Sequence, residues 1–82
     1  MLDDLKVPKG EELFYKTIGE TIRNARTTRN ITQEELAALL QVGVDVIDAY
    51  EQATLAIPIY HFLEIAKFMG WPAEFDEMQK KL

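Results

Sequence analysis

The sequence predicts an all-α fold, a compact domain of four to five helices. Apolar residues recur at spacings of three and four in each segment, which places them on one face of a helix, whereas a strand would alternate them. Thr32 and Glu35 form a helix-start signal, and Asn, Gly or Pro interrupts the apolar pattern between segments. At 82 residues the chain is long enough for one core. We expect an N-terminal arm at residues 1–10, a helical domain at 11–71 and a C-terminal helix or tail at 72–82.

The first two helices are predicted on either side of Asn30, a residue type that adopts left-handed turn conformations. The first covers residues 11–26. Its apolar face consists of Phe14, Ile18, Ile22 and Ala25. At the start of the second, the Thr32 hydroxyl is expected to accept a hydrogen bond from a backbone N–H while Glu35 reaches back to the cap. This helix is about two turns long, and its expected buried stripe is Leu36, Ala37, Leu39 and Leu40.

The next helices are predicted between further breaks in the pattern. The third runs from about residue 44 to 51, with Val46 or Ile47, then Tyr50, facing inward. The fourth begins at a proline, whose missing N–H costs nothing in a first turn, and ends at Gly70. Its expected apolar face is Ile59, Phe62, Leu63, Ala66 and Met69.

A fifth helix is predicted after Pro72. Its apolar positions are Phe75, Met78 and Leu82. We expect this stripe to pack on the domain or on a second subunit, with Trp71 and Phe75 as core or dimer contacts.

Composition indicates a globular domain without catalytic chemistry. Hydrophobic residues make up 48% of the chain and charged residues 28%. The chain has no cysteine and no serine, and its single histidine, His61, is expected on the surface of the fourth helix without an acid at triad-like spacing. We therefore predict no catalytic residue, no cofactor and no metal site. An acidic N-terminus and the lack of an apolar run of roughly 20 residues predict a cytosolic protein with no membrane association.

Charge is distributed unevenly along the chain. The formal net charge is −5, although DNA-binding domains usually carry a basic face. Four cations (Lys16, Arg23, Arg26 and Arg29) are opposed only by Glu20 between residues 16 and 33. Residues 30–66 contain no cation. The acids of this segment are Glu34, Glu35, Asp45, Asp48, Glu51 and Glu64.

Two short helices joined by three residues, with a longer helix before and another after, form the helix-turn-helix arrangement. Over residues 17–71 the chain resembles the phage-repressor/Cro-like domains, also called XRE-type helix-turn-helix regulators. The similar segments are "IGETIRNAR", "ITQEELAALL", "QVGVDVIDAYEQA" and "IPIYHFLEIAKFMGW". The resemblance implies a lambda-repressor-like domain whose third helix enters the major groove of double-stranded DNA.

The resemblance also implies roles for single residues. Gln33 matches a glutamine that contacts a DNA phosphate, and Arg26 and Glu51 match a buried ion pair between the first and third helices. Such a pair orients the third helix more than it adds stability. Buried positions at the helix crossing, the turn and the third helix are matched by Ala37, Val42 and Ile47.

The sequence departs from the family pattern where DNA would be read. The outward positions, on a DNA-binding or partner-binding face, are Gly43, Val44, Asp45, Asp48, Ala49 and Gln52. Gln41 replaces the glycine of the turn, and Gly43 stands where a serine or threonine usually caps the helix and donates to phosphate. Only Gln52 is a versatile base reader. Asp45 or Asp48 could accept from cytosine N4, but both would repel phosphates.

Candidates for phosphate contacts lie mainly on or just after the first helix. They are Lys16, Arg23, Arg29 and, after the third helix, Thr54. Three cations would support only weak binding. The segment after the third helix, residues 54–57, offers no lysine or arginine, unlike many relatives.

The acidic third helix also has readings that need no DNA. Asp45 suits the positive end of the helix dipole, and Asp48 suits a solvated surface. Val44, Leu55 and Ile57, if exposed together, would form an apolar patch rimmed by acids and suited to a protein partner.

Two functions follow from these observations. The first is a transcriptional regulator that binds operator DNA as a homodimer, since symmetric dimers match paired half-sites. The alternative is a regulator with the same fold that binds DNA weakly or not at all and acts through a protein partner, as an antirepressor, antitoxin or antiactivator. A purely structural or oligomerisation module is the third possibility.

Overall fold

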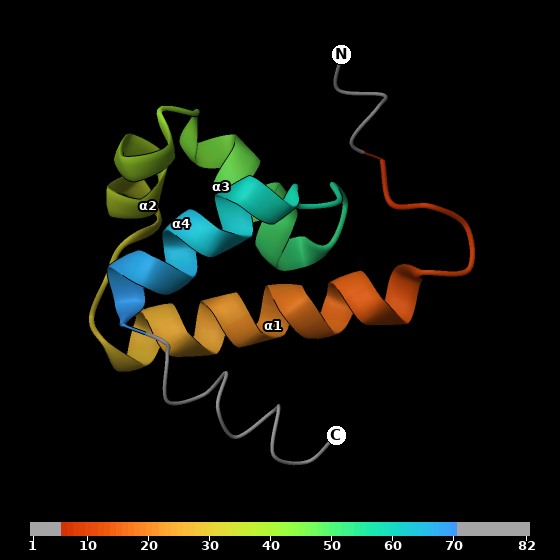
Figure 1. Cartoon of the computed structure of the whole chain (residues 1–82), viewed down its shortest axis with the longest axis horizontal. Coiled ribbons are helices and arrows are strands. Elements are labelled where there is room, and N and C mark those ends of the chain that lie inside the picture. The colour runs from red at the N-terminus through yellow and green to blue at the C-terminus, as the bar shows by residue number, and fades with distance from the viewer. Residues whose placement is uncertain (1–5, 71–82) are drawn as a thin grey trace.

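The computed structural model describes residues 6–70, and within this range the chain folds into four helices and no strand. They are α1 (Glu12–Thr28), α2 (Gln33–Leu40), α3 (Val44–Gln52) and α4 (Ile59–Met69). As Figure 1 shows, α1 is the long base of the domain, and α2, α3 and α4 gather on one side of it. The predicted all-α helix-turn-helix fold is thereby confirmed. The predicted fifth helix, with Trp71 and Phe75, lies outside the described residues.

The start of α2 forms the predicted capping box. Thr32 Oγ1 accepts from the backbone N–H of Glu35 at 3.0 Å, and Glu35 Oε1 accepts from the backbone N–H of Thr32 at 2.9 Å. Asn30 adopts the predicted left-handed conformation, with φ of 57°. The end of α1 lies two residues beyond the prediction, because Thr27 remains helical with its hydroxyl bonded to Arg23 O at 2.9 Å.

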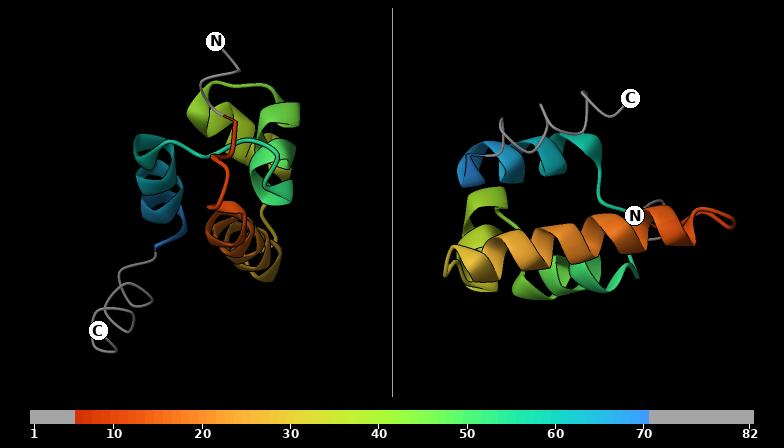
Figure 2. Two further views of the ribbon diagram at one scale, coloured as in Figure 1. Left: turned by 90° about the vertical axis from the view of Figure 1, so that its right-hand side faces the viewer. Right: turned by 90° about the horizontal axis from the view of Figure 1, so that it is seen from below.

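The core forms where the four helices face one another (Figure 2). Its buried apolar residues are Ile22, Leu36, Ala37, Ile47, Tyr50, Ile57, Ile65, Ala66 and Met69. Of the predicted stripe of α2, Leu36 and Ala37 are buried, while Leu39 and Leu40 are half-buried against this cluster. Between residues 6 and 70, each helix is too short or too polar to traverse a lipid bilayer.

Phe14 was predicted on the inward face of α1, and this prediction is wrong. Its side chain is 58% exposed and contacts Tyr15 edge to face. The amino end of α1 projects past α3 and α4 (Figure 1), so the helical pattern continues beyond the point where another helix can cover it. Periodicity reports the direction of a residue on a helix but not how far its neighbours extend.

The inward face of α4 was predicted correctly for Phe62, Ala66 and Met69 but incorrectly for Ile59 and Leu63. Ile59 and Leu63 are 69% and 53% exposed, whereas Ile65, which was not predicted, is 1% exposed. The face that packs consists of Phe62, Ile65, Ala66 and Met69, at helical positions i, i+3, i+4 and i+7. Because α4 is apolar on both sides, its sequence is compatible with either rotation, and tertiary packing selects one.

His61 was predicted on the surface, but it is half-buried at the joint of α3 and α4. Its Nδ1 lies 3.0 Å from the hydroxyl of buried Tyr50, and its ring packs against Tyr60. Desolvation lowers the pKa of His61 below its ordinary value. This histidine therefore belongs to the packing between helices.

Candidate nucleic-acid interface

The turn between α2 and α3 consists of Gln41, Val42 and Gly43. Gln41 ends α2 in the left-handed conformation, with φ of 58° and ψ of 44°, which costs about 1 kcal/mol relative to glycine. Val42 then donates its N–H to Ala37 O at 3.0 Å, and its side chain is half-buried against the core. Gly43 is the N-cap of α3 and makes no side-chain capping bond. The backbone N–H groups at the start of α3 are therefore not capped by a hydroxyl.

An ion pair between α1 and α3 orients the third helix. Arg26 donates from Nε to Glu51 Oε2 at 2.7 Å and from Nη2 to Glu51 Oε1 at 3.1 Å. The two side chains are only 13% and 3% exposed. Hydrogen bonding to Glu51 raises the pKa of Arg26 above its ordinary value, while burial opposes the shift. Two parallel N–H···O bonds from a planar guanidinium restrict the direction as well as the distance of the contact.

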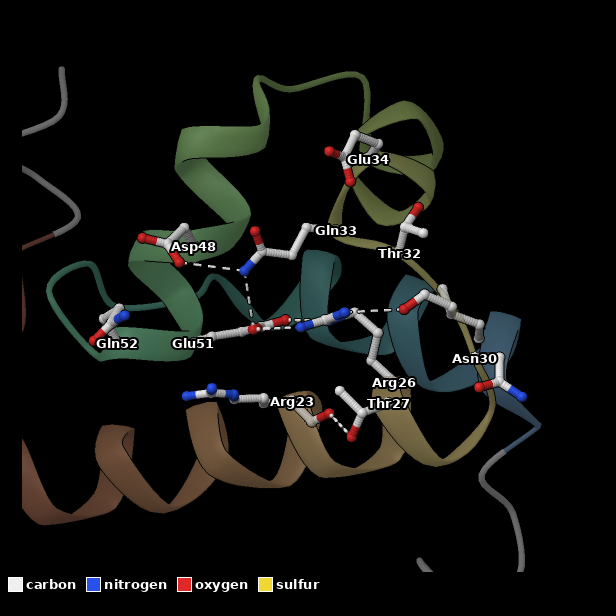
Figure 3. A pocket seen from close by; sticks show the side chains of 11 residues that line it. Arg23, Arg26, Thr27, Asn30, Thr32, Gln33, Glu34, Asp48, Glu51 and Gln52 are labelled. Atoms are coloured by element: carbon white, nitrogen blue, oxygen red, sulfur yellow. Dashed lines mark hydrogen bonds and ion pairs between the residues drawn. The ribbon is translucent and has the colours of Figure 1, made fainter.

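The same arginine also reaches the loop between α1 and α2. Its Nη1 donates to Ile31 O at 3.0 Å. One guanidinium thus joins α1, the loop that follows it, and α3 (Figure 3). The pair that the family resemblance implied is present, and it links the long base helix to the helix-turn-helix unit.

Gln33 extends this network to the surface of α3. Its Nε2 donates to Glu51 Oε1 at 3.1 Å and to Asp48 Oδ1 at 3.2 Å. In Figure 3 the Gln33 amide nitrogen points toward these two carboxylates. Because both N–H groups are engaged, a Gln33–phosphate contact of the kind expected from the resemblance would require one of these hydrogen bonds to open.

Gly19 permits the close crossing of α1 and α3, and the sequence prediction did not include it. A Cβ at this position would lie 2.6 Å from the backbone oxygens of both Tyr50 and Glu51. Only a residue without a side chain lets the carboxyl end of α3 approach α1 so closely. A glycine in the middle of a predicted helix, one residue after Ile18, was the available signal, since helix interiors disfavour glycine unless packing requires it.

A groove of about 700 Å³ lies between α1, the start of α2 and α3. We call it the α1–α3 groove. Its lining residues are Arg23, Arg26, Thr27, Asn30, Ile31, Thr32, Gln33, Glu34, Asp48, Glu51 and Gln52. Ten of these side chains are labelled in Figure 3, where Arg23 projects from α1 and Gln52 stands at the end of α3. The groove is polar and holds charges of both signs, two of which are neutralised in the Arg26–Glu51 pair.

The residues predicted to face outward from α3 share one side of that helix. We call this set the outer face of α3: Gly43, Val44, Asp45, Asp48, Ala49 and Gln52. All are exposed except Ala49, which is half-buried. The outer face carries two carboxylates, one apolar side chain that is 41% exposed (Val44) and no cation.

The predicted apolar patch around α3 does not form. Ile57 is 7% exposed and belongs to the core, and Leu55 is half-buried against it. Val44 is therefore left without these two apolar neighbours. The loop after α3 turns inward because it must lead the chain to α4, and its alternate apolar residues fill the space beneath it.

The candidate phosphate-contacting residues differ in what they bind. Arg29 donates from Nε to Met69 O at 3.0 Å and from Nη1 to Ala25 O at 3.2 Å, so it holds the carboxyl ends of α1 and α4 together. This structural role contrasts with the predicted phosphate contact. Lys16 and Arg23 are exposed on α1, and Thr54 donates its hydroxyl to Ala49 O at 3.3 Å at the end of α3.

The fold and the geometry of α2 and α3 define a helix-turn-helix domain. A family model described as Helix-turn-helix matches residues 22–74, more than half of the chain. The chain belongs to this family, the XRE or Cro/repressor type of helix-turn-helix, which is a family of DNA-binding regulatory domains and not of enzymes. Comparison with curated proteins and with solved structures found no significant match.

Proposed function

We propose that this protein is a transcriptional regulator that binds operator DNA as a homodimer and inserts α3 into the major groove. One observation carries the proposal: the inner side of α3 is tied to α1 by the bidentate Arg26–Glu51 ion pair and to α2 by a hydrogen bond from Gln33, while its outer face is mostly exposed. A helix held rigidly on one side and open on the other can present base-reading side chains in a defined register. A twofold dimer would match two half-sites about one helical turn apart.

Phosphate contacts in this proposal come from Lys16 and Arg23. The two residues are seven positions apart on α1, which places them on the same face of the helix. Arg23 also lines the α1–α3 groove beside α3. Two cations per subunit give about four per dimer, so the slope of log affinity against log salt should be about −4. This slope is shallower than that of strongly basic domains.

The test is fluorescence anisotropy with duplexes selected from a randomised library, measured at about 50 and 200 mM salt. We expect affinity to fall roughly a hundredfold over this range, and Arg23→Ala to weaken binding to all sequences. Lys67→Ala is the matched control, because Lys67 is an exposed cation on α4 and lines neither the groove nor the outer face. Absence of binding at low salt with micromolar protein would reject the operator proposal.

Dimerisation is tested separately by light scattering coupled to size exclusion. Twice the 9.4 kDa chain mass is expected at micromolar concentration. A monomer that remains monomeric on a selected duplex would contradict the paired half-site arrangement.

The lack of cations on the outer face of α3 favours a second candidate, a regulator that acts by binding another protein. The double substitution Val44→Lys and Asp48→Lys separates the two functions, because it reverses the charge of the face. Added cations strengthen attraction to phosphates, whereas they oppose a partner that recognises an acidic face. If a protein partner has the same affinity for this double variant as for the parent protein, that partner does not dock on α3.

A further inference from the structure

We propose that the outer face of α3 reads a pyrimidine-rich strand, in which Asp48, oriented by Gln33, accepts a hydrogen bond from the N4 amino group of a cytosine. This inference rests on the proposed operator binding and specifies its substrate. It assigns Asp48 as a specificity-determining residue and Gln33 as a positioning residue.

The first step is the hydrogen-bonding inventory of the outer face. Asp45 and Asp48 are acceptors, Val44 and Ala49 are apolar, and only Gln52 carries a side-chain donor. Guanine presents only acceptors in the major groove, O6 and N7, and its usual partners are arginine and lysine. The outer face has neither. It therefore lacks the arginine or lysine that usually recognises guanine on the contacted strand, and Gln52 is its one side-chain donor.

Cytosine and thymine have the complementary pattern. Cytosine N4 is a donor, and thymine carries a methyl group that packs against small apolar side chains. Adenine N6 is also a donor, but the neighbouring N7 is an acceptor that would face a carboxylate oxygen. Two acceptors that face each other without a proton between them, after water has been removed, are unfavourable. A carboxylate therefore discriminates against adenine as well as accepting from cytosine.

The second step distinguishes Asp48 from Asp45. Asp48 Oδ1 accepts from Gln33 Nε2 at 3.2 Å, and Gln33 is itself held by Glu51 at 3.1 Å. Glu51 is fixed in turn by the ion pair to Arg26. A continuous series of hydrogen bonds thus runs from the buried side of α3 to its exposed side (Figure 3).

This series restricts the orientation of the Asp48 carboxylate before DNA binds. In the described part of the chain Oδ2 of Asp48 has no hydrogen-bond partner, and the side chain is exposed. A carboxylate whose rotamer is already restricted loses less conformational entropy on making a contact. The geometry therefore points to Asp48 as the acid that reads cytosine, and it explains why Gln33 binds two acids instead of facing solvent.

The experiment is selection of duplexes from a randomised library with the whole chain, followed by competition with single-base variants of the selected site. We expect a half-site with a run of C and T on one strand, and one cytosine whose replacement weakens binding roughly tenfold to a hundredfold. Asp48→Asn should change the preferred base at this position from cytosine to adenine, because asparagine pairs with adenine N6 and N7.

Two further variants separate reading from positioning. Gln33→Ala should reduce the preference at the same position at least severalfold and leave preferences elsewhere in the site unchanged. Asp45→Asn, the matched control on the same face, should retain cytosine at this position. Because Gln33→Ala also removes a bond to Glu51, its circular dichroism and unfolding curve are recorded, and preferences are compared only for folded protein.

The possible outcomes distinguish the inference from the function on which it rests. Selected sites with guanine on the contacted strand, or an Asp48→Asn variant that still prefers cytosine, would overturn the inference while leaving operator binding intact. No enrichment of any sequence by the parent protein would reject operator binding itself, and the inference with it.

Discussion

Glu51 and Asp48 stand on adjacent positions of the α3 surface, yet they belong to different environments. The Glu51 side chain is 3% exposed and accepts two hydrogen bonds from Arg26, whereas Asp48 is exposed and accepts one from Gln33. Both acids bind the same glutamine. The inner acid orients the helix, and the outer acid is available to a ligand.

This comparison shows why a count of charges along the chain misjudges the interface. One of the three acids of α3 is neutralised inside the domain. Two of the four cations between residues 16 and 33, Arg26 and Arg29, are bonded to a carboxylate or to helix-end carbonyls. The face that meets DNA in our proposal therefore carries two cations from α1 and two acids from α3, so its formal charges balance, whereas residues 30–66 alone hold six acids and no lysine or arginine.

The largest effect is expected from removing the inner acid. Glu51→Ala would leave the Arg26 guanidinium buried without its carboxylate and should lower the free energy of unfolding by about 3 kcal/mol. Urea unfolding followed by circular dichroism measures the change. Asp48→Ala, one turn away and exposed, should change stability by less than about 0.5 kcal/mol. Equal losses from the two variants would contradict the distinction between the inner and outer sides of α3.

A smaller effect is expected where the inner side of α3 touches α1. Gly19→Ala places a methyl group 2.6 Å from two backbone oxygens, which cannot move without separating the helices. We expect a loss of about 2 kcal/mol, although alanine is the better helix former. Glu20→Ala is the control, because Glu20 is exposed on the same helix. A Gly19→Ala variant as stable as the parent in urea would show that the crossing is looser than described.

The turn that determines which side of α3 faces outward should respond in the opposite direction. Gln41→Gly removes the steric strain of a side chain in the left-handed conformation and should raise the free energy of unfolding by about 1 kcal/mol. Ala38→Gly, three residues earlier on the exposed side of α2, should lower it by about 1 kcal/mol. Thermal or urea unfolding of both variants tests the opposite signs, and a loss of stability in Gln41→Gly would refute the turn's assignment.

The smallest effect is expected at the joint of α3 and α4. Desolvation lowers the pKa of His61 in the folded protein below the value of about 6.5 in the unfolded chain. Between those two values the unfolded chain binds more protons, so the stabilisation is complete above about pH 6.5 and is lost as the pH falls through the folded pKa. Urea unfolding at about pH 7.5 and pH 5 should show a modest decline that His61→Gln reduces. A larger decline in the variant would oppose this assignment.

Much of the fold could be predicted because its determinants are local. The capping box of Thr32 and Glu35 involves residues three positions apart, and Asn30 takes a left-handed conformation that depends on its own side chain. The Arg26–Glu51 pair was anticipated only through the family resemblance, since the partners are 25 residues apart. Local chemistry alone does not select between distant partners of opposite charge.

The incorrect or missing predictions concern contacts between elements. An apolar residue such as Phe14 or Ile59 fits a helical stripe, but burial requires a neighbouring helix that reaches it. The two hydrogen bonds of Gln33 depend on how far α2 is rotated relative to α3, and those of Arg29 on where α4 ends. These distances are set by packing of the whole core.

The sequence by itself determined to within about two residues where α1 to α4 begin and end, that α2 and α3 form a helix-turn-helix, and that no cation lies on the outer side of α3. Caps, periodicity and residue type decide these properties within a few positions along the chain. Only the tertiary structure decided which acid is neutralised, which two arginines are used by the fold and which carboxylate is held in place at the surface. Those outcomes depend on atoms that approach within hydrogen-bonding distance only after residues far apart in the chain have packed together.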